Sequence, residues 1–365
     1  MLNHKTIAVV VPAYNEESQI EMVIDAMPEF VDRIVIVNDK SKDKTLDVVK
    51  KCIESDKNDY SNELIAEQIP EKNRYNEAEQ VVYEMSQKEK SLFTRSEIVN
   101  ENPNSARIIL INHIDNGGVG AAIASGYKWC KDMNIDCTAV MAGDGQMDPS
   151  ELEGICLPVI DEGVDYVKGN RLIHQSARMV IPKHRFFGNS VLSILTKIAS
   201  GYWRVSDTQT GYTAISLSAL SKIELYKIYP RYGMPNDMLV KLNIASCSLR
   251  EIPIKPVYRV GEQSKMKIRK VIPKISWLLL RSFFKRLWQK YFVRNFHPLF
   301  VLYFIGMMLF VASIPFLVKI IGHAINGIDA NPVTVLAFFF LFISAFQSLL
   351  FAMWMDIQDN ERLYK

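Results

Sequence analysis

The 365-residue sequence has only five cysteines, and no two of them have the Cys-x-x-Cys spacing of a disulfide framework or a zinc site. They are Cys52, Cys130, Cys137, Cys156 and Cys247. An odd number of cysteines without paired spacing favours reduced thiols in a cytosolic domain.

A signal peptide and a large net charge are also lacking. Residues 6–11 form a short β-branched run that stops at Pro12, which is typical of a buried strand and not of a secretory leader. The net charge is +3, too small to indicate nucleic-acid binding. The length fits one α/β domain with an additional segment.

Strand-like and helix-like segments alternate along the first half of the chain. Strands are expected over residues 6–11, 32–37, 107–112 and 137–141, and helices over 17–27, 44–53, 119–130 and 149–159. This alternation predicts a mainly parallel sheet with helices on both faces, whose ligands bind beyond the carboxyl ends of the strands. Residues 54–105 are polar and predict a partly helical insertion, either a lid or docking surface or a solvated segment without chemistry.

Two long charge-free runs follow near the end of the chain, at residues 298–318 and 332–355. Each exceeds the roughly 20 apolar residues that cross a bilayer. We therefore expect transmembrane helices over 298–321 and 332–355, joined by an outside loop over 322–331. A buried hairpin of a soluble protein is the alternative, which two runs of this length disfavour.

The segment 266–297 mixes aromatic and basic residues at helical spacing, as in a helix that lies in the lipid headgroup layer. A soluble amphipathic helix is the alternative. Lys and Arg crowd this segment and recur at Arg362 and Lys365, whereas the loop between the two spans has neither. The positive-inside rule therefore predicts that the large domain, 1–265, and the tail, 356–365, are both cytoplasmic.

Polar or small residues follow each of the first three predicted strands. Tyr14 could pack against a nucleoside and Glu16 could accept a hydrogen bond from it, although simple packing is the alternative for the tyrosine. Asp39 could accept hydrogen bonds from a base or ribose. Asn116 and the two glycines after it let backbone come close to a ligand. Ile123 stands where a dinucleotide fingerprint has its third glycine, so hydride transfer is disfavoured.

The fourth predicted strand runs into Gly143-Asp-Gly-Gln146, the strongest local signal. Asp144 and Gln146 offer the oxygen ligands that a hard divalent cation takes, and diphosphate oxygens would complete its shell. Such a cation offsets the charge that develops on a leaving nucleotide. An acidic turn without metal is the alternative.

This ordered set of motifs resembles glycosyltransferase family 2, and within it the polyprenyl-phosphate group of dolichyl-phosphate mannose and glucose synthases. The similarity runs from Lys5 to Lys267, apart from the insertion. It implies a GT-A type fold, which is α/β with a mainly parallel sheet, followed here by the interfacial helix and the two transmembrane helices. One departure is Ala142, because the family often has a second acid at that position.

The resemblance implies Mg²⁺ or Mn²⁺ bound by Asp144 and Gln146. It also implies a nucleotide-sugar site formed by Pro12, Ala13, Tyr14, Glu16, Asp39, Asn116, Gly117, Asp144 and Lys265. The acceptor phosphate would be bound by Arg171, Arg185, Asn189 and Arg259. A guanidinium fork suits phosphate better than an ammonium does, although a surface ion pair is the alternative for each arginine. Asp144, Asp237 and Arg171 are the predicted catalytic residues.

The implied reaction is an inverting transfer of a sugar from a UDP- or GDP-linked donor to a polyprenyl phosphate at the cell membrane. A phosphate monoester is already an anionic nucleophile, so cations that position two anionic substrates matter more than a strong base. Another lipid or polysaccharide acceptor remains open, although a processive synthase is disfavoured because the sequence lacks a Gln-x-x-Arg-Trp motif. A membrane-tethered binding module without catalytic activity also remains open, and Ala142 is the only residue that favours it. The chain could also form a homo-oligomer.

Overall fold

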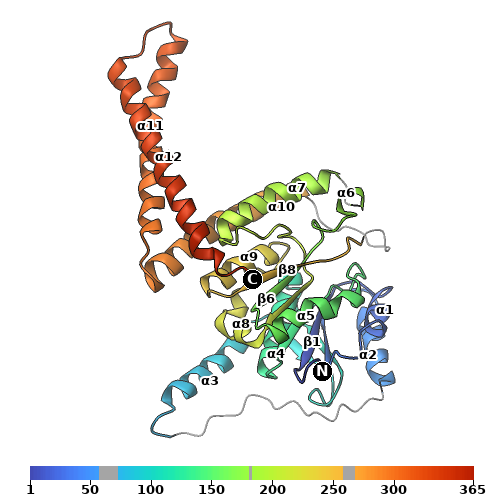
Figure 1. Cartoon of the computed structure of the whole chain (residues 1–365). Helices are drawn as coiled ribbons and strands as arrows, with labels where there is room; N and C mark the ends of the chain where they lie inside the picture. Colours follow the sequence, from blue (N-terminus) through green and yellow to red (C-terminus); the bar gives the residue numbers. More distant parts are fainter. Residues whose placement is uncertain (57–72, 181–182, 258–267) are drawn as a thin grey trace.

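The computed structural model of the chain describes residues 1–56, 73–180, 183–257 and 268–365. Arg259 and Lys265, both predicted to bind substrate, lie outside the described residues, and so do the side chains of Arg185 and Asn189. The described chain forms an α/β domain and a long helical hairpin that stands away from it (Figure 1).

A single eight-stranded sheet forms the centre of the domain, in the order β3-β4-β2-β1-β5-β7-β6-β8. Its strands are β1 (Ile7–Ala13), β2 (Arg33–Asn38), β3 (Ser96–Ile98), β4 (Ile108–His113), β5 (Cys137–Val140), β6 (Tyr166–Asn170), β7 (Thr213–Ser216) and β8 (Leu249–Pro253). Only β3 and β7 run antiparallel to their neighbours. The predicted mainly parallel sheet is therefore confirmed, and β1, β2, β4, β5, β6 and β8 all end at the same edge.

Helices cover both faces of the sheet because the strands are apolar on both sides. In β1, Ile7, Val9 and Val11 face one core, and Ala8 and Val10 face the other. The first face is covered by α1 (Ile20–Asp25), α2 (Thr45–Ser55) and α5 (Leu152–Asp161), and the second by α4 (Val119–Asp132), α8 (Leu217–Lys222) and α9 (Met234–Ile244). The result is a three-layer sandwich in which α1 is shorter than the helix predicted over 17–27.

The insertion predicted over residues 54–105 contains α3 (Glu77–Lys90) and the edge strand β3. The predicted helical content is thus present, and β3 pairs with β4 as an antiparallel edge. Lys128 of α4 is buried beneath α3, where it donates to Ser86 at 3.4 Å and pairs with Asp132. The rest of α3 is largely exposed and projects from the domain (Figure 1).

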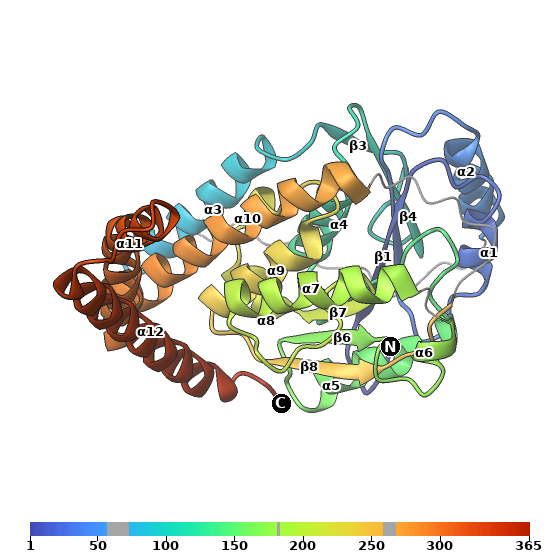
Figure 2. The same ribbon diagram turned by 90° about the horizontal axis from the view of Figure 1, so that it is seen from above.

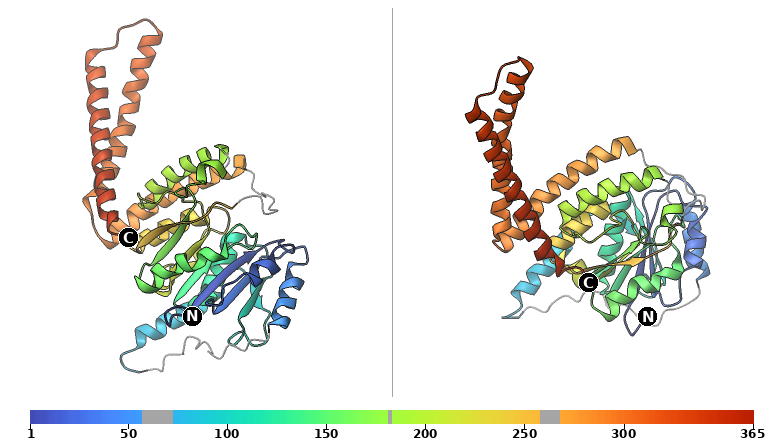
Figure 3. Two further views of the ribbon diagram at one scale, coloured as in Figure 1. Left: turned by 45° about the vertical axis from the view of Figure 1, so that its right-hand side comes forward. Right: turned by 45° about the horizontal axis from the view of Figure 1, so that its top comes forward.

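The hairpin is reached through α10 (Ile268–Trp288) and a π-helical turn, η3 (Gln289–Arg294). In Figure 2, α10 lies beside α7 (Lys183–Ser200), on the same side of the domain as α9. The hairpin itself consists of α11 (Pro298–Ile325) and α12 (Pro332–Glu361), which pack against each other and away from the domain (Figure 3). Both helices are long and apolar enough to cross a membrane, and most of their side chains are exposed.

The C-terminus returns to the sheet. The amide of Leu249 donates to the carbonyl of Leu363 at 2.6 Å, and the amide of Lys365 donates to the carbonyl of Leu249 at 2.9 Å. The side chain of Leu363 is buried in the core. The last residues therefore dock as a short parallel bridge beside β8, a contact that the sequence pattern of the predicted tail did not indicate.

Candidate active site

The loops that follow β1 and β2 are joined by hydrogen bonds at the carboxyl edge of the sheet. The amide of Asn15 donates to Ser41 Oγ at 3.0 Å, and the amide of Glu16 donates to Thr45 Oγ1 at 2.9 Å. Pro12 and Ala13 end β1 in register with β2. Tyr14 and Glu16 are half-buried at this edge, so the predicted nucleotide-binding residues of the first loop lie together.

Asp39 lies just beyond β2 and is almost fully buried. Its Oδ1 is 2.9 Å from His113 Nδ1 and accepts from the amide of Gly117 at 2.8 Å, while its Oδ2 accepts from the amide of Gly118 at 2.7 Å. Asn116 Nδ2 donates to the Asp39 carbonyl at 2.9 Å. The carboxylate therefore holds the Asn-Gly-Gly loop against β2.

Burial alone would raise the pKa of Asp39, but the hydrogen bond from His113 and those from the two glycine amides outweigh it and hold that pKa below its ordinary value. Gly118 has a φ of +90°, and a Cβ there would lie 2.5 Å from the Pro230 carbonyl oxygen. The loop conformation thus depends both on the buried charge of Asp39 and on glycine at this position.

Asp144 and Gln146 lie on one turn after β5. Gly145, between them, has a φ of +71°, and the Gln146 amide donates to Asp144 Oδ1 at 3.1 Å. Both side chains are half-buried. A carboxylate and a carboxamide oxygen on one turn fit a hard divalent cation whose other ligands come from a bound diphosphate. Within the described part of the chain, no group of three or more His, Cys, Asp or Glu residues could hold a metal ion. A cation at this turn would therefore need the diphosphate as a further ligand.

Arg171 follows β6 and forms a forked ion pair with Asp207. Its Nε donates to Asp207 Oδ2 at 2.8 Å and its Nη2 donates to Oδ1 at 3.1 Å. Asp207 is buried, and burial alone would raise its pKa, but Arg171 reverses that effect and lowers it. The guanidinium is thereby fixed at the carboxyl edge of the sheet, on the far side of the Asp144 turn from Asp39 in strand order.

Asp237 lies in the first turn of α9. It accepts from the Tyr229 amide at 2.9 Å and pairs with Lys241 at 2.5 Å. The segment that Tyr229 begins contacts the Asn-Gly-Gly loop, because the Gly120 amide donates to the Pro230 carbonyl at 2.9 Å. The hydrogen bonds of the described residues thus link Asp237 to the Asn-Gly-Gly loop through this neighbouring segment.

The family assignment follows from a comparison with protein-family models. The model described as "Glycosyl transferase family 2" matches residues 8–66 and 88–224, which together make up more than half of the chain. The chain belongs to glycosyltransferase family 2. The matched region contains every strand-end residue discussed above, from Tyr14 to Arg171, and the mixed sheet is of the GT-A type that the sequence predicted.

Curated relatives of this family 2 glycosyltransferase include two enzymes that are named for lipid phosphates. A UDP-N-acetylglucosamine–dolichyl-phosphate N-acetylglucosaminyltransferase of Methanococcus voltae is 28% identical over 255 residues, covering 70% of this chain and 86% of its own. A dolichyl-phosphate β-glucosyltransferase of Trichomonas vaginalis is 23% identical over 297 residues, covering 77% and 74%.

Among solved structures, glucosyl-3-phosphoglycerate synthase of Mycobacterium tuberculosis, crystallised with Mn²⁺, UDP and glucosyl-3-phosphoglycerate, aligns with this glycosyltransferase. The alignment has a TM-score of 0.46 and 14% identity, and it covers 78% of this chain and 80% of the other.

The sequence reasoning missed the buried partners of the site residues. Asp207 N donates to Glu251 Oε1 at 3.0 Å, and Lys168 Nζ, fully buried in β6, donates to the Thr210 carbonyl. A lysine in the middle of a buried strand was a usable signal, because a buried ammonium needs acceptors and counter-charges. No local pattern indicated His113 as the partner of Asp39.

Lys168 gives the glycosyltransferase a specific pH dependence. Burial lowers its pKa from 10.5 to about 8, against the raising effect of Asp207 and Glu251. Protonating this lysine therefore costs the folded state free energy below pH 8, and that cost disappears as the pH rises from about 8 to 10.5. Across this window, the unfolding free energy of the wild type in detergent should rise by roughly 1–3 kcal/mol relative to Lys168→Met. If the unfolding free energies of the two proteins changed equally with pH, the lowered pKa of Lys168 would be contradicted.

Proposed function

We propose that this glycosyltransferase moves a sugar from a nucleoside diphosphate donor to a polyprenyl phosphate at the cytoplasmic surface of a membrane. The main support is the arrangement of three features at one edge of the sheet, namely the loop organised by Asp39, the Asp144–Gln146 turn and the Arg171 fork. These lie in a chain that also carries an apolar hairpin. The names of the relatives agree with a lipid phosphate acceptor.

On the donor side, Tyr14, Glu16 and the Asn116–Gly117 loop would bind the nucleoside, with Asp39 acting by holding that loop. Asp144 and Gln146 would bind Mg²⁺ or Mn²⁺ together with the donor diphosphate. The cation supplies charge neutralisation for the departing nucleoside diphosphate. With Ala142 in place of a second acid, the protein contributes a single carboxylate, so cation binding should depend strongly on the nucleotide.

On the acceptor side, Arg171 would bind and orient the acceptor phosphate, assisted by Arg185, Asn189 and Arg259. A phosphate oxygen attacks the anomeric carbon, the bond from that carbon to the donor phosphate oxygen breaks, and the nucleoside diphosphate leaves with the bonding electrons. Attack opposite the leaving group inverts the anomeric centre. Asp237 would orient the sugar or the acceptor, and its hydrogen bond from the Tyr229 amide would fix the 229–231 segment against the Asn-Gly-Gly loop.

The membrane side of the proposal rests on the exposed face of α10. Trp277, Leu280, Phe284 and Trp288 are exposed and recur at three- and four-residue spacing along one side of the helix. Trp288 stacks on Phe292 with ring centroids 4.4 Å apart, which continues the aromatic face toward α11. Such a face suits the headgroup layer, where an acceptor phosphate would meet the strand-end site while its prenyl tail stays in lipid.

A direct test incubates the purified protein in vesicles with labelled UDP- and GDP-sugars and polyprenyl phosphate. We expect label in a chloroform-soluble product only when both polyprenyl phosphate and a divalent cation are present. Label transferred to a lipid or polysaccharide without a phosphate monoester would favour the alternative acceptors. No transfer with any donor in the panel would favour an inactive binding module.

A further inference from the structure

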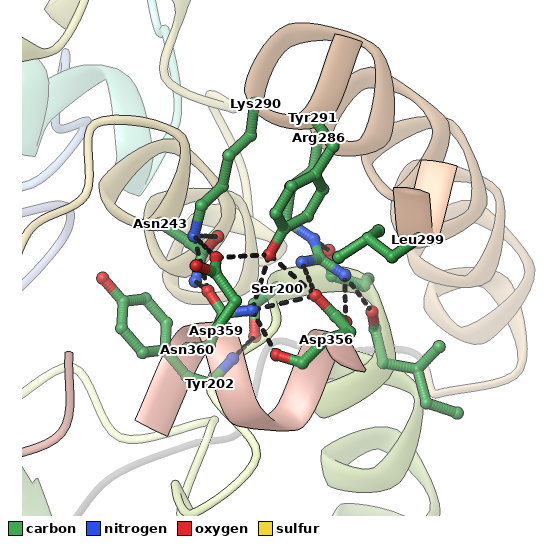
Figure 4. A network of polar contacts seen from close by, with 12 residues as sticks. Ser200, Tyr202, Asn243, Arg286, Lys290, Tyr291, Leu299, Asp356, Asp359 and Asn360 are labelled. Atoms are coloured by element: carbon green, nitrogen blue, oxygen red, sulfur yellow. Dashed lines mark hydrogen bonds and ion pairs between the residues drawn. The ribbon is translucent and has the colours of Figure 1, made fainter. Parts of the chain in front are cut away.

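A buried polar network joins the end of the membrane hairpin to the catalytic domain (Figure 4). Arg286 of α10 and Asp356 of α12 form a forked ion pair, with Nη1–Oδ1 at 2.7 Å and Nη2–Oδ2 at 2.8 Å. Neither side chain is exposed at all. The last turns of α12 are therefore held inside the protein by a pair of opposite charges that has no contact with solvent.

The same guanidinium also binds the end of α7. Arg286 Nε donates to the Ala199 carbonyl at 2.9 Å, and Nη2 donates to the Ile198 carbonyl at 3.1 Å. These carbonyls lie in the last turn of the helix, where cations are favourable. Gly201 follows with a φ of +77°, and a Cβ there would lie 2.5 Å from Arg286 Nη1, so glycine is needed for this approach.

A second part of the network reaches α9. Lys290 donates to Asn360 Oδ1 at 2.5 Å and to Asn243 Oδ1 at 3.1 Å, and Asn243 Nδ2 donates to Asn360 Oδ1 at 2.7 Å. Tyr291 donates to Asp356 Oδ1 at 2.9 Å. The π-helical turn that carries Lys290 and Tyr291 thus connects α9 and α12, and such turns often mark functional positions.

Stability alone does not account for this choice of residues, because well-packed apolar side chains would usually serve at least as well as a buried ion pair. The network instead fixes one geometry. It connects α12 with α7, whose first half carries Arg185 and Asn189, and with α9, which carries Asp237. Within the domain, α7 is held separately, since Ser193 donates to the Ser206 carbonyl and Thr196 to Asn236.

We propose that Arg286 and Asp356 are positioning residues that hold the acceptor site at a fixed depth and tilt relative to the membrane hairpin. This inference rests on the proposed function, because it assigns the network to a membrane-embedded phosphate acceptor. Loosening the network frees the hairpin while α7 stays in the domain. A lipid-bound acceptor then presents its phosphate at the wrong depth, whereas a short water-soluble prenyl phosphate reaches the site unaided.

Asp356→Asn tests this inference against a matched control on the same helix, Glu361→Gln. Glu361 pairs with Arg204 at the surface, where both side chains are more than half exposed and the pair contributes little. For Asp356→Asn, we expect kcat/KM to fall at least about tenfold with long-chain polyprenyl phosphate in vesicles and to change less than about twofold with the short acceptor. Glu361→Gln should leave both values unchanged.

A distance measurement tests whether the network fixes the hairpin on the domain, and it does not depend on enzyme activity. Spin labels at Lys222→Cys in α8 and Ile325→Cys at the end of α11 report how the hairpin sits on the domain, and the five native cysteines are buried. We expect one narrow distance distribution in the parent and in Glu361→Gln, and a broad one in Asp356→Asn. Unchanged width, or equal losses with both acceptors, would overturn the inference. A wild type that transfers to neither acceptor while the distances behave as expected would refute the proposed function alone.

Discussion

Replacing Asp144 with Asn is expected to lower kcat/KM for sugar transfer by about 10³-fold or more, because it removes the only carboxylate in the proposed cation site. Asn keeps the size of the side chain and can still accept from the Gln146 amide, so the turn should survive. Steady-state transfer at saturating Mg²⁺ or Mn²⁺ measures the loss. Raising the cation concentration should recover only part of the activity, since the neutral amide binds a hard cation weakly.

Asp148→Asn is the matched control, four residues along the same loop. Asp148 caps the following turn by accepting from Ser150, and it pairs with Lys255 at 3.1 Å. Its pKa is held below the ordinary value mainly by the Ser150 hydrogen bond. An Asn can cap the same turn, so transfer should change less than about threefold. Equal losses in the two variants would mean that any charge change in this loop disrupts it, and would refute a specific role for Asp144.

Replacing Asp39 with Asn should raise KM for the nucleotide sugar by about 50-fold, while kcat falls much less. The carboxylate accepts from His113, Gly117 and Gly118, and an amide cannot accept from all three through both of its terminal atoms. One buried donor is left unsatisfied, and the Asn-Gly-Gly loop loses its position. Donor KM and equilibrium binding of nucleoside diphosphate measure the effect.

Asp115 provides the control for this loop. It is exposed and pairs with Lys40 at 3.5 Å and Arg95 at 3.3 Å, so Asp115→Asn changes the same net charge at the surface. Surface pairs of this kind contribute little, and donor KM should stay within about twofold of the wild type. If both variants raised KM equally, the loop would respond to overall charge and not to the buried carboxylate.

The first half of the fold could be predicted because its strands are apolar, β-branched and separated by helical stripes. β1, β2, β4 and β5 lie where those runs predicted them. β7 could not be predicted in its place, since its insertion antiparallel between β5 and β6 depends on packing between distant segments. The hydrogen bond from the Leu249 amide to the Leu363 carbonyl is likewise a contact between residues far apart in the sequence.

The sequence predicted which residues form the site, but it predicted less well which atoms those residues contact. Parallel strands bring their carboxyl ends to one edge of the sheet. Once the strands were assigned, it followed that Tyr14, Asp39 and Asp144 lie near one another. Which atom each contacts depends on loop conformation. Asp39 was predicted as a direct nucleotide ligand, whereas its described contacts are internal, to His113 and the glycine amides. Its direct contact with nucleotide remains a prediction.

Binding of Mn²⁺ in the presence of nucleoside diphosphate tests most directly whether a cation is bound by the Asp144 turn together with the donor diphosphate. The free Mn²⁺ signal in electron paramagnetic resonance gives the bound fraction for the wild type and for Asp144→Asn, with UDP, with GDP and with neither. We expect wild-type binding that is strong only with one of the nucleotides, and at least about tenfold weaker binding in Asp144→Asn. Nucleotide-dependent binding that is equally tight in both proteins would contradict the account.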